Sequence, residues 1–125
     1  MKDGPDIARI ANLIGDPARA NMLTALMAGK ALTATELANE AGVTQQTASS
    51  HLRKLEEGRL ISPRKQGRHR YFALADERIA RSLEALMDLA QNTGHTRTRT
   101  GPKDARLREA RVCYNHLAGQ MATRL

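Results

Sequence analysis

The sequence is poor in cysteine, in aromatic residues and in long apolar runs, and these absences exclude several classes of protein. A single cysteine, Cys113, leaves no disulfide framework within the chain. No apolar run approaches the roughly 18 residues that a membrane-spanning helix needs, so we expect at most peripheral membrane contact. The beginning, MKDGPDIARIANL, lacks the order of segments typical of a signal peptide. We therefore expect a cytoplasmic protein.

Positive charge is abundant instead. Twenty Lys and Arg residues stand against thirteen Asp and Glu, which gives a net charge of +7 on 125 residues, about the size of one domain. This balance favours a polyanionic partner, either nucleic acid or an acidic membrane surface. Much of the charge lies in one segment, RKQGRHRYF at residues 64–72, which runs into two of the three aromatic residues of the chain.

Hydrophobic periodicity predicts two helices at the start of the chain. Apolar side chains in residues 7–14 follow the i, i+3, i+4, i+7 spacing of one helical face. Asp16 followed by Pro17 is typical of a helix start, because the carboxylate accepts hydrogen bonds from unpaired backbone N–H groups. The second helix is expected to extend to about residue 28, with Gly29 ending it.

Residues 33–57 have the pattern of a helix-turn-helix. Thr33 and Glu36 have the spacing of a capping box at the start of a short helix. Gly42 interrupts that helix, and Thr44 offers a new N-cap two residues later. Two helices joined by a tight glycine turn are therefore predicted, with a second helix over residues 44–57.

A β-hairpin is predicted directly after this unit, over residues 60–74. Apolar and aromatic residues favour strands on either side of a turn at Gln66 and Gly67. Pro63 cannot donate a hydrogen bond to a sheet, so its strand should lie at an edge, as in a two-stranded ribbon that projects from a helical body.

The remaining residues predict two further helices. Asp76 is a suitable N-cap for a fifth helix that ends near Asn92. We expect a polar linker at 95–101 and an amphipathic helix at 102–125. The predicted fold is mainly α with a small β-hairpin wing (α+β), a winged helix-turn-helix. Residues 1–94 form its DNA-binding domain, with terminal helices that dimerise.

Two parts of this unit are suited to different parts of DNA. The second helix presents uncharged or titratable groups, which can donate to and accept from base edges in the major groove. The hairpin carries cations that suit phosphates. The candidate DNA-binding residues are Gln45, Gln46, Thr47, Ser49, Ser50, His51 and Arg53 of the helix, and Arg64, Lys65, Arg68, His69 and Arg70 of the wing.

Two simpler interpretations of these residues are less consistent with the sequence. The charged run could be a solvated face, and the glycine turn could simply join two packed helices; two features of one mechanism in the expected order argue against that. Ser49, Ser50 and His51 could suggest nucleophilic catalysis, but neighbouring helical residues point apart and no partner is expected to position the imidazole. We therefore predict no enzymatic activity, no catalytic residue and no cofactor.

The segments GDPARANMLTAL, TASSHLRKLEEGRLI and RKQGRHRYFAL together resemble the ArsR/SmtB family of bacterial winged helix-turn-helix repressors, over about residues 5–92. The resemblance implies a homodimer that blocks a promoter and releases DNA when a signal is sensed. The sequence itself adds apolar stripes at 7–14 and 79–90, which a small domain cannot easily bury alone. A dimer would place two recognition helices about one DNA turn apart, which predicts an inverted-repeat operator in double-stranded DNA.

The chain departs from the family at its metal sites. Many members sense metal through cysteines at positions that correspond to Thr33 and Thr35, and neither threonine is a useful soft-metal ligand. Others bind an ion through histidines of the last helix of the domain, and DERIARSLEALMDLA contains none. We therefore predict no metal site of either kind and an unidentified inducer.

Cys113, His116 and His95 are the remaining candidates for sensing. They could hold zinc or copper, or Cys113 could act as a redox switch. Packing is the favoured interpretation, because Cys113 falls on the apolar face of its helix, where free cysteine behaves as a small hydrophobe. Larger regulators that resemble the family continue beyond a segment like REARVCYNHLAG, so we hypothesise that this chain is a shortened form of one.

The function predicted from the sequence is a dimeric, sequence-specific transcriptional repressor. Its recognition helix, 44–57, enters the major groove, and its basic wing, 60–74, lies on the DNA backbone. Two alternatives remain open at this point. One is a nucleoid-type or RNA-binding protein without sequence preference, and the other is a protein-interaction module whose terminal helices bind a partner regulator.

Overall fold

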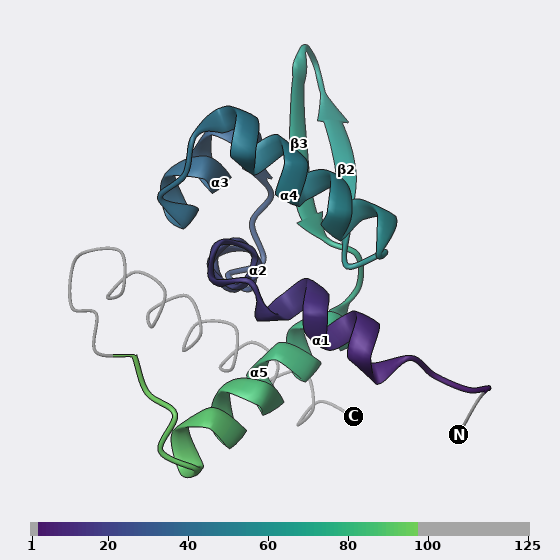
Figure 1. The fold of residues 1–125 in the computed structure, drawn as a ribbon. Helices are drawn as coiled ribbons and strands as arrows, with labels where there is room; N and C mark the ends of the chain where they lie inside the picture. Colours follow the sequence, from purple (N-terminus) through teal and green to yellow (C-terminus); the bar gives the residue numbers. More distant parts are fainter. Residues whose placement is uncertain (1–2, 98–125) are drawn as a thin grey trace, which may run out of the picture.

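The computed structural model describes residues 3–97, which form five helices and one small sheet (Figure 1). The helices and strands, in chain order, are α1 (Ile7–Gly15), α2 (Pro17–Leu26), β1 (Leu32–Thr33), α3 (Ala34–Ala41), α4 (Gln45–Glu57), β2 (Ile61–Gln66), β3 (His69–Leu74) and α5 (Glu77–Asn92). This is the predicted winged helix-turn-helix. The expected helix at 102–125, with Cys113 and His116, lies outside the described residues.

Polar caps begin the helices where the sequence predicted them. The Asp16 carboxylate accepts from the backbone N–H groups of Ala18 and Arg19, which starts α2. At α3, Glu36 N–H donates to Thr33 Oγ1 at 3.2 Å and Thr33 N–H donates to Glu36 Oε1 at 2.9 Å, so the capping box is complete. Such a cap stabilises a helix by about 1 kcal/mol. Local sequence therefore fixes where these helices begin.

The helix-turn-helix packs through its apolar positions onto α2. Gly42 joins α3 to α4 with a φ of +70°, in the left-handed region that favours glycine. Most of the core lies between these three helices and the base of the hairpin. Its fully buried large side chains are Met22, Leu23, Leu26, Met27, Leu37, Leu55 and Ile61. This core sets the angle at which α4 crosses the molecule.

The sheet has three strands in the order β1-β3-β2, one strand more than the predicted ribbon. Leu32 pairs with Phe72 and Thr33 with Tyr71 in β1–β3, a run too short to show the alternation of a strand in the sequence. Pro63 lies in β2, an edge strand as predicted.

The hairpin turn lies one residue later than predicted. Gln66 pairs with His69, so the two loop residues are Gly67 and Arg68 rather than Gln66 and Gly67. Gly67 has a φ of +65° at the first loop position, where a two-residue hairpin of type II′ needs glycine. The requirement of the turn for a positive φ therefore decides the register.

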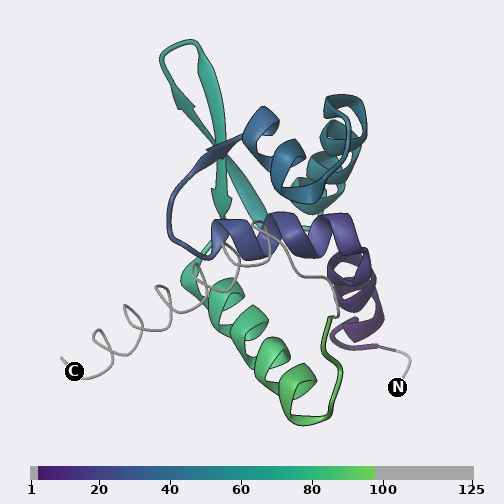
Figure 2. The ribbon, with the colours of Figure 1, turned by 90° about the vertical axis from the view of Figure 1, so that its left-hand side faces the viewer.

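The two end helices bury only part of their apolar surface. Both lie on the side of α2 that faces away from the hairpin tip (Figures 1 and 2). Leu13 of α1 and Leu83 of α5 are buried, but four large apolar side chains remain exposed by 43 to 80%: Ile7, Ile10, Leu86 and Leu89. The predicted stripe of α1 is thus largely uncovered in the single chain.

A close contact fixes the C-terminal end of α4 against α1. Gly58 is the C-cap of α4, and a Cβ at this position would overlap the Leu13 side chain. The next residue, Arg59, has a φ of +62°, and Leu60 N–H donates to the carbonyl of Leu55, which closes the helix end. Glycine at position 58 therefore leaves room for the end of the Leu13 side chain, and it does not have a positive φ.

We expect Gly58→Ala to destabilise the fold by about 1–3 kcal/mol, because the added methyl group overpacks the contact with Leu13. Urea unfolding followed by circular dichroism measures this. Gly15→Ala is the matched control, since nothing lies within 4 Å of the added Cβ. That variant should be as stable as the wild type or more stable by up to about 1 kcal/mol. Equal stability of the two variants would contradict the contact.

Candidate nucleic-acid interface

Helix α4 has one buried side and one exposed side. Ala48, Leu52 and Leu55 recur at i, i+4, i+7 and are buried against the core. Gln46, Ser50 and Arg53 recur with the same spacing on the other side, and all three are exposed. The helix therefore presents a polar stripe to solvent along its N-terminal half.

Two of the predicted α4 site residues make contacts within the protein. Gln45 Nε2 donates to Thr35 Oγ1 at 2.7 Å, which ties the start of α4 to α3. Thr47 Oγ1 accepts from Thr44 Oγ1 at 3.0 Å, at the N-cap. Both side chains are nevertheless exposed, together with Ser49. Gln45 and Thr47 lie beside the polar stripe, and their hydrogen bonds hold the start of α4 in place.

His51 lies apart from the other predicted site residues of α4. Its side chain is only 15% exposed and lies against the corner between α1 and α2, not on the polar stripe. His51 Nδ1 lies 3.0 Å from an Nη atom of Arg19, and Nε2 lies 3.7 Å from Asp16 Oδ2. The expectation that no partner positions the imidazole is wrong, because both ring nitrogens face a side chain of α2 or its N-cap. His51 therefore joins α4 to the corner between α1 and α2.

Arg19 is the buried centre of this corner, with 7% of its surface exposed. Its Nε donates to the carbonyl of Leu13 at 2.7 Å and an Nη atom donates to that of Asn12 at 3.0 Å, at the end of α1. A guanidinium has only donors, so the contact between Arg19 and His51 is a hydrogen bond when Nδ1 carries no proton. The other ring nitrogen, Nε2, faces Asp16. No sequence pattern connects Arg19 to a residue 32 positions later.

The pKa of Asp16 is set by the same corner. Burial raises the pKa of the carboxyl, but the backbone N–H of Arg19, the charge of the His51 imidazolium, the Arg19 guanidinium and the N–H of Ala18 together lower it more. The pKa of Asp16 thus lies below its ordinary value of 3.8.

The cations of the wing lie on its two faces and at its tip, and not on a single surface. Lys65 pairs with Arg70, so both point to the face that also carries the buried Phe72. Arg64 pairs with Tyr71, so both lie on the opposite face. His69 lies on that face as well, and its ring meets the Tyr71 ring edge-on, with 6.4 Å between the ring centres. Arg68 lies in the turn. These five residues therefore cannot all contact the same phosphates.

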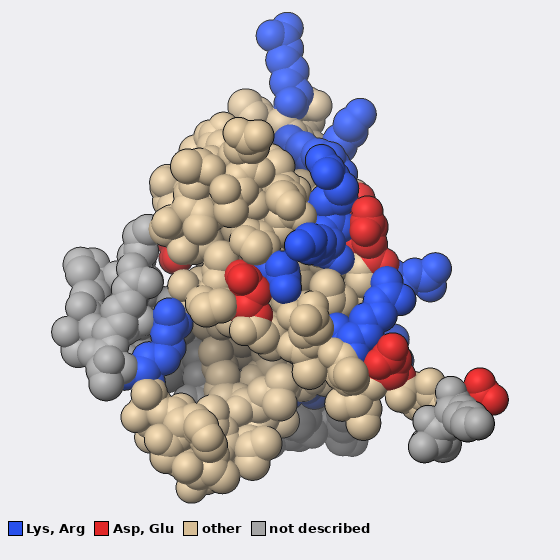
Figure 3. All heavy atoms as spheres, in the orientation of Figure 1, with Lys and Arg blue, Asp and Glu red and all other residues tan. Residues whose placement is uncertain are grey.

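Positive side chains gather over one part of the surface. Figure 3 shows Lys and Arg along the hairpin and down the adjoining side, whereas the surface over α3 is mostly uncharged. A few acidic side chains lie among these cations. The basic surface and the polar stripe of α4 are thus close neighbours.

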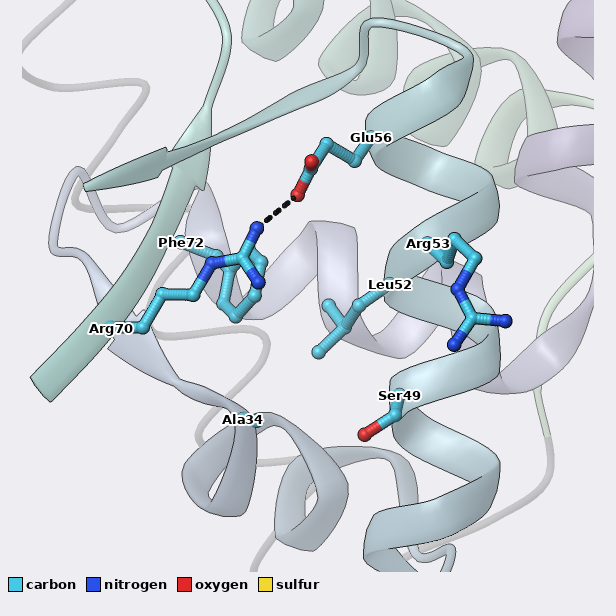
Figure 4. Close-up of a pocket in the computed structure, with 7 residues that line it drawn as sticks. All are labelled: Ala34, Ser49, Leu52, Arg53, Glu56, Arg70 and Phe72. Atoms are coloured by element: carbon cyan, nitrogen blue, oxygen red, sulfur yellow. Dashed lines mark hydrogen bonds and ion pairs between the residues drawn. The ribbon is translucent and has the colours of Figure 1, made fainter. Parts of the chain in front are cut away.

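A groove separates α4 from the hairpin. It has a volume of about 440 Å³ and is lined by Ala34, Ser49, Leu52, Arg53, Glu56, Arg70 and Phe72 (Figure 4). Arg70 reaches across it to Glu56, with 3.0 Å between Nη and Oε1. Glu56 was absent from the candidate residues, because the sequence does not show that β3 places Arg70 opposite it.

Comparisons with known proteins agree with this geometry. Residues 14–64 match the model of a helix-turn-helix domain. CmtR, a helix-turn-helix transcriptional regulator of Mycobacterium tuberculosis, is 34% identical over 83 residues, which cover 66% of this chain and 70% of CmtR. The chain belongs to the ArsR/SmtB family. The chain therefore carries the helix-turn-helix domain of a family of transcriptional regulators, which is not a family of enzymes.

One further relative in sequence and one solved structure are also similar to this chain. The uncharacterized regulator YdfF of Bacillus subtilis is 42% identical over 121 residues, or 97% of this chain. The chain spans only 54% of the length of YdfF. The homodimeric winged helix-turn-helix domain of Mb0332 from Mycobacterium bovis has the same fold, with a TM-score of 0.64 at 23% identity over 81% of this chain and all of that one.

Thr33 and Thr35, which we expected to correspond to the metal-binding cysteines of other family members, have structural roles in this chain. Thr33 caps α3, and the Thr35 hydroxyl accepts a hydrogen bond from Gln45. Residues 3–97 contain no group of three or more His, Cys, Asp and Glu that could hold a metal ion. Within the same range, no helix is both long and apolar enough to cross a membrane.

We expect Asp16→Asn to reduce the acid sensitivity of the fold. Because the folded-state pKa is lowered, the carboxylate stabilises the protein above pH 3.8, and this contribution is lost as the pH falls through the folded value. Asparagine keeps the N-cap oxygen but cannot titrate. Urea unfolding between pH 2.5 and 7 should give a flatter stability profile for the variant at the acid end. Parallel profiles would show that Asp16 makes no such contribution.

Proposed function

We propose that this protein is a dimeric repressor that binds an inverted-repeat operator and releases it when an unidentified signal is sensed. One observation carries the proposal: the exposed polar stripe of α4 lies beside a basic hairpin on the same part of the surface (Figures 1 and 3). Base contacts and phosphate contacts can then be made in a single binding event.

Helix α4 is assigned to the major groove. Gln46 and Ser50 lie one turn apart on its exposed side, near the N-terminal end that meets base edges in helix-turn-helix proteins. A glutamine amide can both donate to and accept from adenine, which lets it discriminate between base pairs. Arg53 lies one turn further along and is suited to a phosphate at the edge of the groove.

The wing is assigned to the DNA backbone. Arg68 lies in the turn at its tip, and Lys65 and Arg70 line the face toward α4. Each cation that neutralises a phosphate releases condensed counterions, so the binding should depend steeply on salt. Arg64 and His69, on the other face, are expected to contribute less to the same complex.

Dimerisation is assigned to α1 and α5. Their exposed apolar side chains, Ile7, Ile10, Leu86 and Leu89, would be covered by the same surface of a second copy. The similar domain of Mb0332 is described as homodimeric. An inverted repeat would then require the two α4 helices of the dimer to lie about 34 Å apart, one turn of DNA.

The releasing signal is proposed to act away from the two metal positions of the family. CmtR is described as a cadmium sensor, but in this chain Thr33 and Thr35 are engaged in helix capping and in the contact with α4. We therefore propose no inducer-binding residues within residues 3–97.

Two substitutions test the division between helix and wing. Arg68→Ala should weaken binding to all duplexes about equally and lower the salt slope by roughly one unit. Gln46→Ala should cost about 1–3 kcal/mol on the operator and little on a scrambled duplex. Fluorescence anisotropy with the gene's own upstream promoter DNA and a scrambled duplex, each over a series of salt concentrations, measures both effects.

The same titrations separate the alternatives. Equal affinity of the wild type for both duplexes would contradict sequence-specific repression and favour a nucleoid-type protein. A monomer that binds neither duplex would favour a protein-interaction module. An exchange of the two mutant effects would reverse the roles assigned to α4 and the wing.

Leu89→Glu tests the dimer. Burying a carboxylate in an apolar interface without a partner is unfavourable, so we expect dimerisation to weaken at least tenfold. Sedimentation equilibrium measures the dissociation constant. Arg81→Gln is the matched control, because it is exposed on α5 away from the apolar stripe and changes the net charge by the same amount. Equal dimerisation of both variants would contradict the assignment of α5.

A further inference from the structure

Glu56 is an acidic residue placed among cations that face DNA in the proposed complex. Its Oε1 lies 3.0 Å from an Nη atom of Arg70, and the two side chains are 37% and 56% exposed. The Arg70 guanidinium also lies over the ring of Phe72, 5.1 Å from the ring centre. Arg70 thus reaches across the groove toward α4, while more than half of its side chain stays exposed (Figure 4).

The fold explains why these two residues meet. Arg70 and Phe72 are two positions apart in β3, so they share a face, and Phe72 is buried toward α4. On α4, Leu52 and Glu56 are one turn apart and line the same groove. The packing that buries Phe72 therefore also brings Arg70 to Glu56.

The groove contains further groups that suit an anion. Ser49 and Arg53 line it from α4, one turn apart. Lys65 lies directly opposite Arg70 on the same face of the hairpin. In this surrounding, the Glu56 carboxylate is the anion that Arg70 binds in the free protein. A DNA phosphate that approached the groove would compete with it for the same guanidinium.

We propose that Glu56 is an internal competitor of DNA: it occupies Arg70 in the free protein and is exchanged for a phosphate when DNA binds. The inference rests on the proposed function. Breaking the ion pair costs binding free energy on any sequence, whereas the base contacts of α4 act only on the operator. Glu56 thus lowers sequence-independent binding, so that contacts to bases contribute a larger share of the total.

The test compares Glu56→Gln with Glu57→Gln on the full chain. Both variants remove one negative charge at the end of α4, but Glu57 is exposed and does not line the groove. Exposed ion pairs are weak, so we expect Glu56→Gln to bind a scrambled duplex roughly two- to fivefold more tightly than Glu57→Gln in about 0.1 M salt. The gain on promoter DNA should be similar. Circular dichroism verifies that both variants are folded.

A double-mutant cycle identifies the partner. In an Arg70→Ala background, the advantage of Glu56→Gln over Glu57→Gln should disappear, because no guanidinium remains to be released. Equal affinities of the two single variants would overturn the inference, and so would an advantage that persists without Arg70. Weaker binding by Glu56→Gln would also overturn it, because Glu56 would then orient Arg70 for DNA.

The experiment distinguishes this inference from the proposed function. If the wild type binds promoter DNA selectively but Glu56→Gln gives no gain, only the role of Glu56 is wrong. If neither the wild type nor any variant binds either duplex, the proposed function fails, and the role of Glu56 fails with it.

Discussion

The hydrogen bonds of the buried Arg19 guanidinium are the interaction on which the position of α4 depends. The guanidinium donates to two carbonyls at the end of α1 and to His51 of α4, so one side chain joins three helices. A helix end leaves its last carbonyls without partners inside the helix, and Arg19 supplies donors to two of them. Because a buried cation must be hydrogen-bonded, the geometry of this corner is narrowly defined. This corner therefore adds directional contacts to the apolar packing that turns the polar stripe of α4 outward.

Local sequence was sufficient to predict the helices and the order in which the helices and the hairpin follow one another along the chain. The caps at Asp16 and Thr33 and the glycine turn at Gly42 were predictable, because each satisfies backbone groups within four residues of itself. The hairpin was predictable from composition, and its exact turn was not. The register depends on which loop position has the positive φ. Gly67 could occupy either the second position of a Gln66–Gly67 turn or the first position of a Gly67–Arg68 turn.

The site was less predictable than the fold, since it depends on contacts between distant segments. Periodicity places His51 near the other polar residues of α4, but only the packing of α4 against α2 brings it to Arg19. In the same way, a basic segment looks uniform in the sequence, whereas strand pairing divides it between two faces. Glu56 acquires a role only through the approach of β3 to α4. Residue types indicated the chemistry, and tertiary contacts decided which residues carry it.

The short strand β1 has a mechanical consequence. Thr33 pairs with Tyr71 of the hairpin and also caps α3, so a single residue belongs both to the base of the wing and to the helix-turn-helix. Leu32 adds a second backbone pair beside it. The wing is therefore not a hinged arm, because a tilt of the hairpin must carry the start of α3 with it. The base of the hairpin and the start of the helix-turn-helix are therefore one connected piece of backbone, which limits how far the distance between the wing and α4 can change.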